Sequence, residues 1–116
     1  MVATELKKVE KNVYYKRATA TAKIPYVIYR FTTTNFYSER EEVFLEIDIW
    51  DIRKDGYDVI TAIETRAKNI VDVLKKFRHL DGDMFVSFEI INKLDLIDED
   101  ENIERIQLRY RLRKYN

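Results

Sequence analysis

The chain has 116 residues, of which 21 are Lys or Arg and 21 are Asp or Glu, so its formal net charge is zero. Hydrophobic residues make up 46% and charged residues 36%, which excludes a disordered chain, and no apolar run approaches the ~20 residues that would cross a bilayer. The composition fits a single domain over residues 1–116, lacks the basic excess that phosphate binding usually needs, and tolerates packing against copies of itself.

The N-terminal part of the chain predicts short elements. Residues 4–12 fit a short helix of about two turns, and residues 13–15 fit a short strand. An exposed Ala/Thr-rich loop over residues 16–23 follows. A second strand then runs over residues 26–32, with Pro25 at its entrance, where a missing N–H removes no ladder hydrogen bond.

The stretch Glu41–Asp51 predicts the central strand of a sheet, because it is rich in β-branched and aromatic residues and has no Gly or Pro. Its alternation puts one apolar set on the inner face: Val43, Leu45, Ile47 and Ile49. The outer face carries carboxylates and two aromatic rings: Glu42, Phe44, Glu46, Asp48 and Trp50. The question of binding partners therefore begins with that outer face.

A long amphipathic helix is predicted from about Tyr57 to Phe77, with Asp55 or Asp58 as its N-cap. The apolar stripe expected to lie on the sheet consists of Ile60, Ile63, Ala67, Ile70, Leu74 and Phe77. The pairs Glu64 with Lys68 and Asp72 with Lys76 have the spacing of ion pairs on the exposed face.

The C-terminal part predicts two further strands, residues 84–91 and 103–115, joined by an acidic connector over 94–102. Thirteen residues of strand would span roughly 43 Å, so we expect the end of the last strand to project beyond the sheet. The predicted fold is therefore α+β: an antiparallel or mixed sheet of four to five strands with the long helix and the short N-terminal helix packed on it.

Two predicted strands carry complementary charges. Arg105, Arg109, Arg111 and Arg113 lie on one face of the last strand, and Glu42, Glu46 and Asp48 lie on the outer face of the central strand. These groups would form cross-strand ion pairs on a solvated face if the strands are neighbours, or contacts between subunits, or a site for nucleic-acid phosphates. The matched acids weigh against the third interpretation.

No motif predicts catalysis. The only histidine, His79, follows the long helix and fits a helix-terminal cap, and the acidic run Asp98–Asn102 has no Gly for the sharp turn of a calcium loop. We therefore expect no enzyme, no metal and no cofactor. The absence of Cys and of a signal-like N-terminal segment predicts a cytoplasmic protein. Phe36 and Tyr37, in a polar loop, either finish the core or anchor an interface.

Several stretches together resemble the tail-completion or tail-terminator (head–tail joining) proteins of long-tailed, siphophage-type bacteriophages and prophages. The resembling stretches are VYYKRA (13–18), IPYVIYRF (24–31), NFYSEREE (35–42), LEIDIWD (45–51), KKFRH (75–79) and DEDENIERIQLRY (98–110). They follow one another in order from residue 13 to residue 110.

The resemblance implies a virion structural subunit that assembles with itself into a ring, a hexamer, at the head-proximal end of the tail. The ring caps the tail tube, contacts the tail-tube protein and the head-completion (stopper) protein, and lets DNA pass without specific recognition or membrane contact. Assembly takes place in the host cytoplasm. The implied subunit contacts are Phe36, Tyr37, Glu39, Arg40, Glu46, Asp48, Arg105, Arg109 and Arg111.

Two alternatives remain open. The first is a small, non-enzymatic ferredoxin-like module that binds a ligand, or a peptide strand at its sheet edge. The second is a nucleic-acid-processing factor, such as a toxin-like nuclease using His79 with nearby acids. Particle mass in solution separates a ring from the first alternative, and loss of activity in His79→Ala would support the second.

Overall fold

The computed structural model describes residues 2–34, 42–81 and 84–115, which form one six-stranded sheet and two helices. In chain order the elements are α1 (Val2–Lys7), β1 (Val13–Tyr15), β2 (Tyr26–Thr34), β3 (Glu42–Ile52), α2 (Val59–Lys75), β4 (His79–Asp81), β5 (Met84–Leu96) and β6 (Ile103–Tyr115). The strand order across the sheet is β1-β2-β3-β6-β5-β4. β1 pairs with β2 in parallel and the other neighbours are antiparallel, which confirms the α+β class with a mixed sheet.

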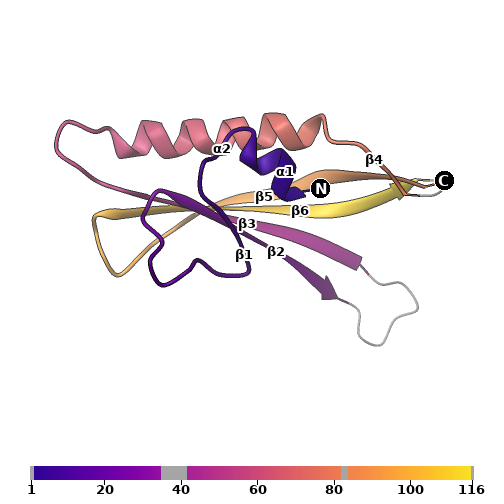
Figure 1. Cartoon of the computed structure of the whole chain (residues 1–116), viewed down its shortest axis with the longest axis horizontal. Helices are drawn as coiled ribbons and strands as arrows, with labels where there is room; N and C mark the ends of the chain where they lie inside the picture. Colours follow the sequence, from indigo (N-terminus) through magenta and orange to yellow (C-terminus); the bar gives the residue numbers. More distant parts are fainter. Residues whose placement is uncertain (1, 35–41, 82–83, 116) are drawn as a thin grey trace.

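Both helices lie on one face of this sheet (Figure 1). The two-residue alternation of β3 turns Leu45, Ile47 and Ile49 toward the helices, and all three are fully buried. The core that they form is completed by Ile106 and Leu108 of β6 and by Ile63, Ala67, Ile70 and Leu74 of α2. The central strand is therefore the strand that the sequence predicted, with its apolar set facing inward.

The N-terminus of α2 is fixed by Asp58, one of the two predicted caps. Its carboxylate accepts hydrogen bonds from the Thr61 backbone N–H at 3.1 Å and from the Thr61 hydroxyl at 2.7 Å. These bonds, the hydroxyl bond first, hold the pKa of Asp58 below its ordinary value. At the other end, Arg78 donates to the Lys75 and Phe77 carbonyls, as expected for a cation at a helix C-terminus.

Replacing Asp58 with Ala is expected to lower the melting temperature by roughly 2–5 °C, because the cap satisfies a backbone N–H that is otherwise unbonded. Thermal unfolding followed by circular dichroism measures the change. Asp55→Ala is the matched control, since Asp55 is an exposed acid in the same turn. Equal losses in the two variants would contradict the assignment of the cap.

The buried side of α2 differs from the predicted stripe at its first turn. Ile60 is 58% exposed, whereas Val59 is 3% exposed and packs inward. The helix starts directly after Asp58, so the buried positions run Val59, Ile63, Ala67, Ile70 and Leu74. Ile60 lies one residue away, about 100° around the helix, and its placement on the stripe was wrong.

Three predicted boundaries also change. β5 continues through Leu96, so the connector begins later than residue 94, and α1 ends at Lys7 rather than near Asn12. Past α1 the chain turns, and the carboxylate of Glu10 reaches Arg66 of α2. Residues 79–81, for which the sequence predicted no strand, form β4. His79 therefore belongs to a strand and not to a helix cap, because α2 is capped at Lys76.

The long β6 strand extends beyond part of the sheet, as expected. It pairs with β3 only up to Arg111, whereas its pairing with β5 continues to Tyr115. The start of β5 and the end of β6, with β4 paired beside β5, thus project past β3 (Figure 1). In the described structure, the last residues of β6 therefore pair with β5 on one side and with no β3 residue on the other.

Candidate interaction surface on the open sheet face

In the described ranges both helices cover one face of the sheet, so we call the opposite face the open face (Figure 1). The strand register assigns the side chains to this face, because cross-strand partners point to the same side. Its centre is formed by Tyr26, Ile28 and Arg30 of β2, Phe44, Glu46, Asp48 and Trp50 of β3, and Arg105, Gln107, Arg109 and Arg111 of β6.

Charged side chains cross the middle of the open face in one row. Arg30 binds Glu46 through Nε at 2.9 Å and Nη2 at 2.8 Å, and Arg109 Nε lies 3.9 Å from the other Glu46 oxygen. The hydrogen bond to Glu46 raises the pKa of the Arg30 guanidinium above its ordinary value. On the next row, Gln107 donates to Asp48 at 3.0 Å. Within one chain, β3 and β6 are neighbours and the first of the three sequence interpretations describes these contacts.

The arginines of β6 on this face also lie close to aromatic rings. The Arg105 guanidinium lies 3.9 Å from the centre of the Trp50 ring, and Arg109 lies 4.3 Å from the centre of Phe44. Arg111 also reaches Phe44, at 5.8 Å. Such cation–π contacts are worth about 0.5–1 kcal/mol at exposed sites and more where water is excluded.

One end of the open face forms an aromatic patch. Tyr14 meets Tyr26 edge-on with ring centres 5.9 Å apart, and Tyr26 tilts against Trp50 at 5.7 Å. Arg105, stacked on Trp50, also lies 3.7 Å from the Asp98 carboxylate. Burial is the main cause that raises the pKa of Tyr26. The patch and the charged row together make a flat surface of alternating rings, cations and acids.

Several nitrogen atoms of this surface are buried without a hydrogen-bond acceptor among the described residues: Nε of Arg105, Arg109 and Arg111, and Nε1 of Trp50. Buried donors of this kind normally find a partner. The side chains of Arg105 and Arg109 nevertheless stay 23% and 35% exposed, so acceptors on a second protein surface would reach the accessible part of these arginines. This makes the open face a candidate for contact with another protein chain.

The structure brings five of the predicted contact residues together on the open face: Glu46, Asp48, Arg105, Arg109 and Arg111. Their predicted role as subunit contacts stays a prediction. Phe36, Tyr37, Glu39 and Arg40 lie outside the described residues. Arg113 and Glu89 form a further ion pair between β6 and β5, and the hydrogen bond from Arg113 lowers the pKa of Glu89.

A buried ionic cluster on the helix side was not predicted. Asp51 is fully buried at the inner end of β3 and accepts bonds from Arg66 Nε at 3.2 Å, the Tyr57 hydroxyl at 2.8 Å and the Ile52 N–H at 2.8 Å. Arg66 Nη1 also binds Glu10 at 2.7 Å. The sequence signal was available: Asp51 continues the inward positions 45, 47 and 49, where a carboxylate needs a partner.

The pH dependence of stability should report on Glu10. Burial is the main cause that raises its pKa, against the lowering effect of Arg66, so the folded chain holds this proton more tightly than the unfolded chain. The contribution that this tighter proton binding makes to the free energy of unfolding is fully present below the pKa of the unfolded chain. It is lost as pH rises through the raised pKa of the folded chain. Wild type should therefore lose stability relative to Glu10→Gln as pH rises through that window. Urea unfolding of both proteins over a pH series that begins below the ordinary glutamate pKa of about 4.3 measures it, and a constant difference would contradict it.

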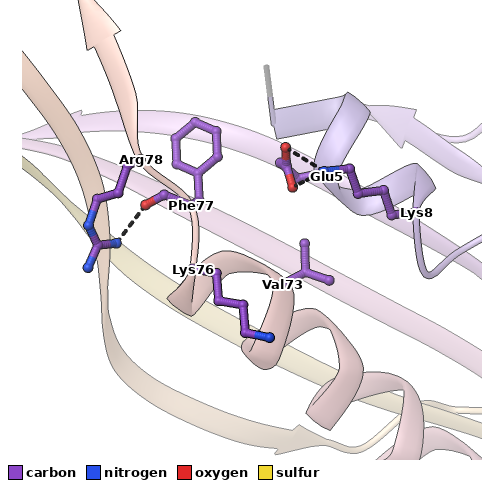
Figure 2. Close-up of a pocket in the computed structure, with 6 residues that line it drawn as sticks. All are labelled: Glu5, Lys8, Val73, Lys76, Phe77 and Arg78. Atoms are coloured by element: carbon purple, nitrogen blue, oxygen red, sulfur yellow. Dashed lines mark hydrogen bonds and ion pairs between the residues drawn. The ribbon is translucent and has the colours of Figure 1, made fainter.

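A pocket of about 340 Å³ lies between α1 and the end of α2, lined by Glu5, Lys8, Val73, Lys76, Phe77 and Arg78 (Figure 2). Lys8 turns to Glu5, with which it pairs at 3.0 Å, and Arg78 turns to the Phe77 carbonyl at 2.6 Å. These internal contacts account for three of the charged groups. We therefore assign no ligand to this pocket.

Across residues 2–34, 42–81 and 84–115, no group of three or more His, Cys, Asp or Glu side chains is arranged to hold a metal ion. No helix in the same ranges is long and apolar enough to span a membrane.

Comparison with known proteins finds a similarity of structure but not of sequence. No family model and no curated protein sequence matches the chain. Among solved structures, the chain is similar to one from a structure titled "Virion of native gene transfer agent (GTA) particle", with a TM-score of 0.65 and 13% sequence identity. The similarity covers 100% of this chain and 85% of that chain. At this identity the likeness establishes a shared fold.

Proposed function

We propose that this chain is a tail-terminator subunit, a virion structural protein that forms a ring, a hexamer, at the head-proximal end of a phage tail. The ring caps the tail tube and joins it to the head-completion protein. The role is structural and needs no cofactor. The observation that carries the proposal is the whole-chain fold likeness to a component of a virion, in agreement with the family that the sequence stretches resemble.

The open face supports an assembly role. The Arg105 and Arg109 guanidinium groups lie 3.9 Å and 4.3 Å from the centres of the Trp50 and Phe44 rings, so a partner meets a surface already ordered and partly dehydrated. Arginine and aromatic side chains are the residue types enriched at the centres of protein interfaces. The formal net charge of zero removes the long-range repulsion that would oppose assembly of identical subunits.

The two ends of the sheet also differ, which suits a protein that joins two unlike partners. The turn between β5 and β6 carries Asp98, Glu99, Asp100 and Glu101 and lies at the end where α2 begins (Figure 1). The opposite end, where α2 finishes, carries Lys75, Lys76 and Arg78. Arg53, whose backbone N–H donates to Asn102, and Lys54 also lie beside the acidic turn. In a ring whose axis follows the strands, the two rims would therefore present different charge patterns, one mixed and one with a basic cluster, and each would select a different partner.

The test is mass measurement by light scattering after size-exclusion chromatography, at low micromolar and at the highest soluble concentration. Arg109→Glu is expected to weaken the ring while the monomer stays folded, because it interrupts the alternation of charge that runs across the open face from Arg30 through Glu46 to Arg109. Lys68→Glu is the control: it reverses one exposed charge on the helical side of the molecule. Circular dichroism confirms folding of both.

An Arg109→Glu protein that assembles like wild type would contradict the role given to the open face. A wild-type chain that remains monomeric at every concentration would contradict self-driven ring formation and favour the alternative, a small module that binds a peptide strand at its sheet edge.

A further inference from the structure

At each edge of the sheet a short strand, β1 or β4, covers only part of the longer strand beside it, β2 or β5, in the described structure. β1 pairs with Val27–Tyr29 of β2, and β4 pairs with Met84–Val86 of β5. The rest of each outer side, residues 30–34 of β2 and 87–96 of β5, faces no further strand of the described chain. Open strand edges present unpaired N–H and C=O groups, which pair readily with another strand.

These two open stretches lie at the same level of the sheet. Following the register across the four long strands gives two rows: Phe31–Leu45–Tyr110–Ile90 and Thr32–Phe44–Arg111–Glu89. The β-bulge between Ile90 and Asn92 ends the regular part of β5 just below these rows. The uncovered residues of β2 therefore stand level with residues 87–90 of β5, between the parts that β1 and β4 cover.

Strand direction favours pairing between the two edges of successive copies. β2, β3, β6 and β5 alternate in direction, so β5 runs opposite to β2. Copies related by rotation about an axis along the strands keep their directions and their faces. The β5 edge of one copy would then meet the β2 edge of the next as an antiparallel pair, with all helices on one side.

We propose that successive copies of this chain join edge to edge, residues 31–34 of β2 pairing antiparallel with residues 87–90 of the neighbour's β5, to form one continuous sheet around the ring. The inference rests on the proposed ring function and names its contact. The interface is heterologous, so each copy uses a different edge toward each neighbour. The pairing spans about 14 Å of strand.

A pocket on the helix side of β5 fits this contact. It has a volume of about 290 Å³ and is lined by Val71, Lys75, Phe88, Ile90 and Tyr110. Tyr110 is 2% exposed, and its hydroxyl is buried without a hydrogen-bond partner in the described residues. Phe31 of the next copy, half-buried in its own chain and level with Ile90, would reach this pocket from the adjoining edge.

The exposed apolar residues of β5 agree with a covered edge. Ile90, Ile91 and Leu94 are 44%, 39% and 45% exposed, and Lys93, an inward-pointing charge of the kind that opposes edge pairing, lies below the proposed contact. On the open face, Glu89 would lie diagonally across from Arg30 of the next copy, within reach of a long side chain. The alternation of charge that runs from Arg30 through Glu46 to Arg109 would thus continue from copy to copy.

Cysteine cross-linking tests the register, because the natural chain contains no Cys. Thr32→Cys and Glu89→Cys, both on the open face and on one row, are combined in one chain under mild oxidation. Within a chain these positions are three strand spacings apart, about 14 Å, too far for a disulfide, so only a neighbouring copy can react. We expect a ladder of disulfide-linked oligomers on a denaturing gel. Phe31→Cys with Ile90→Cys is the second pair, on the helix side of the adjacent row.

The matched control pair is Thr32→Cys with Lys93→Cys. Lys93 lies on the helix side of β5, where it binds Glu64, and below the proposed contact, so this pair should give no ladder. Equal ladders from matched and control pairs, or no ladder from either matched pair, would overturn the inference.

Thr33→Pro gives a test by strand chemistry. The Val27 N–H donates to Asn12 and the Tyr29 carbonyl accepts from Lys16, so the odd residues of β2 direct their backbone groups away from β3. Pro at exposed position 33 would spare the β2–β3 ladder but remove an outward donor. We expect a folded monomer, while Thr33→Ala assembles like wild type.

The outcomes separate the two proposals. If the wild type forms a ring and Thr33→Pro also forms it, the edge contact is wrong and the ring function stands. If the wild type itself forms no ring at the highest soluble concentration, both proposals fail.

Discussion

Replacing Arg66 with Met is expected to lower the free energy of unfolding by about 3 kcal/mol, more than any surface substitution in this chain. Arg66 bridges two carboxylates: Asp51, which is fully buried, and Glu10, whose side chain is 3% exposed. Removing the guanidinium leaves both acids in the interior without a cation, and an unpaired buried charge costs far more than the intact pair contributes. Urea unfolding at neutral pH measures the loss.

Lys68→Met is the matched control for Arg66→Met, because Lys68 is a cation on the same helix but exposed. Its effect should stay within about 0.5 kcal/mol. A second check uses pH: the penalty of Arg66→Met should shrink on acidification, as the Glu10 carboxylate, whose pKa burial raises, takes up a proton. A penalty that is equal in the two variants, or independent of pH, would show that Arg66 acts only through its packing.

The reach of sequence reasoning is clearest on β3 and β6. A strict two-residue alternation fixed which side chains share a face, so Glu46 and Asp48, and separately Arg105, Arg109 and Arg111, were correctly expected on one side of their strands. Alternation says nothing about which strands are neighbours. The pairing of Glu46 with Arg109 depends on a crossover through α2 and β5, and such a long-range contact has no local signature.

The buried cluster shows a different limit. Asp51 occupies an inward position of β3, yet a carboxylate at the end of a strand is just as compatible with an exposed turn. Only the approach of Arg66 and Tyr57 decides between the two environments. Likewise β4 forms because residues 79–81 find β5 beside them, and three residues are too few to carry a pattern of their own.

Which face of α2 is buried depends on the residue at which the helix begins, and a pair of substitutions measures it through the free energy of unfolding. Ile63→Ala should lower the free energy of unfolding by about 3 kcal/mol, because Ile63 is 2% exposed and its loss leaves a cavity against the sheet. Ile60→Ala should change it by less than about 0.5 kcal/mol, since Ile60 is 58% exposed and Ala is the better helix former.

The two isoleucines stand three residues apart on one helix, and a three- or four-residue period alone assigns both to the core. What separates them is the start of the helix at Asp58, which turns Val59 inward and Ile60 outward. Equal losses in the two variants, measured by urea unfolding, would mean that α2 sits on the sheet about one residue of rotation away from the arrangement described. A large loss at Ile63 alone fixes the side of α2 that faces β3 and β6. It thereby also fixes the side, with Val71 and Lys75, that borders the pocket at the β5 edge.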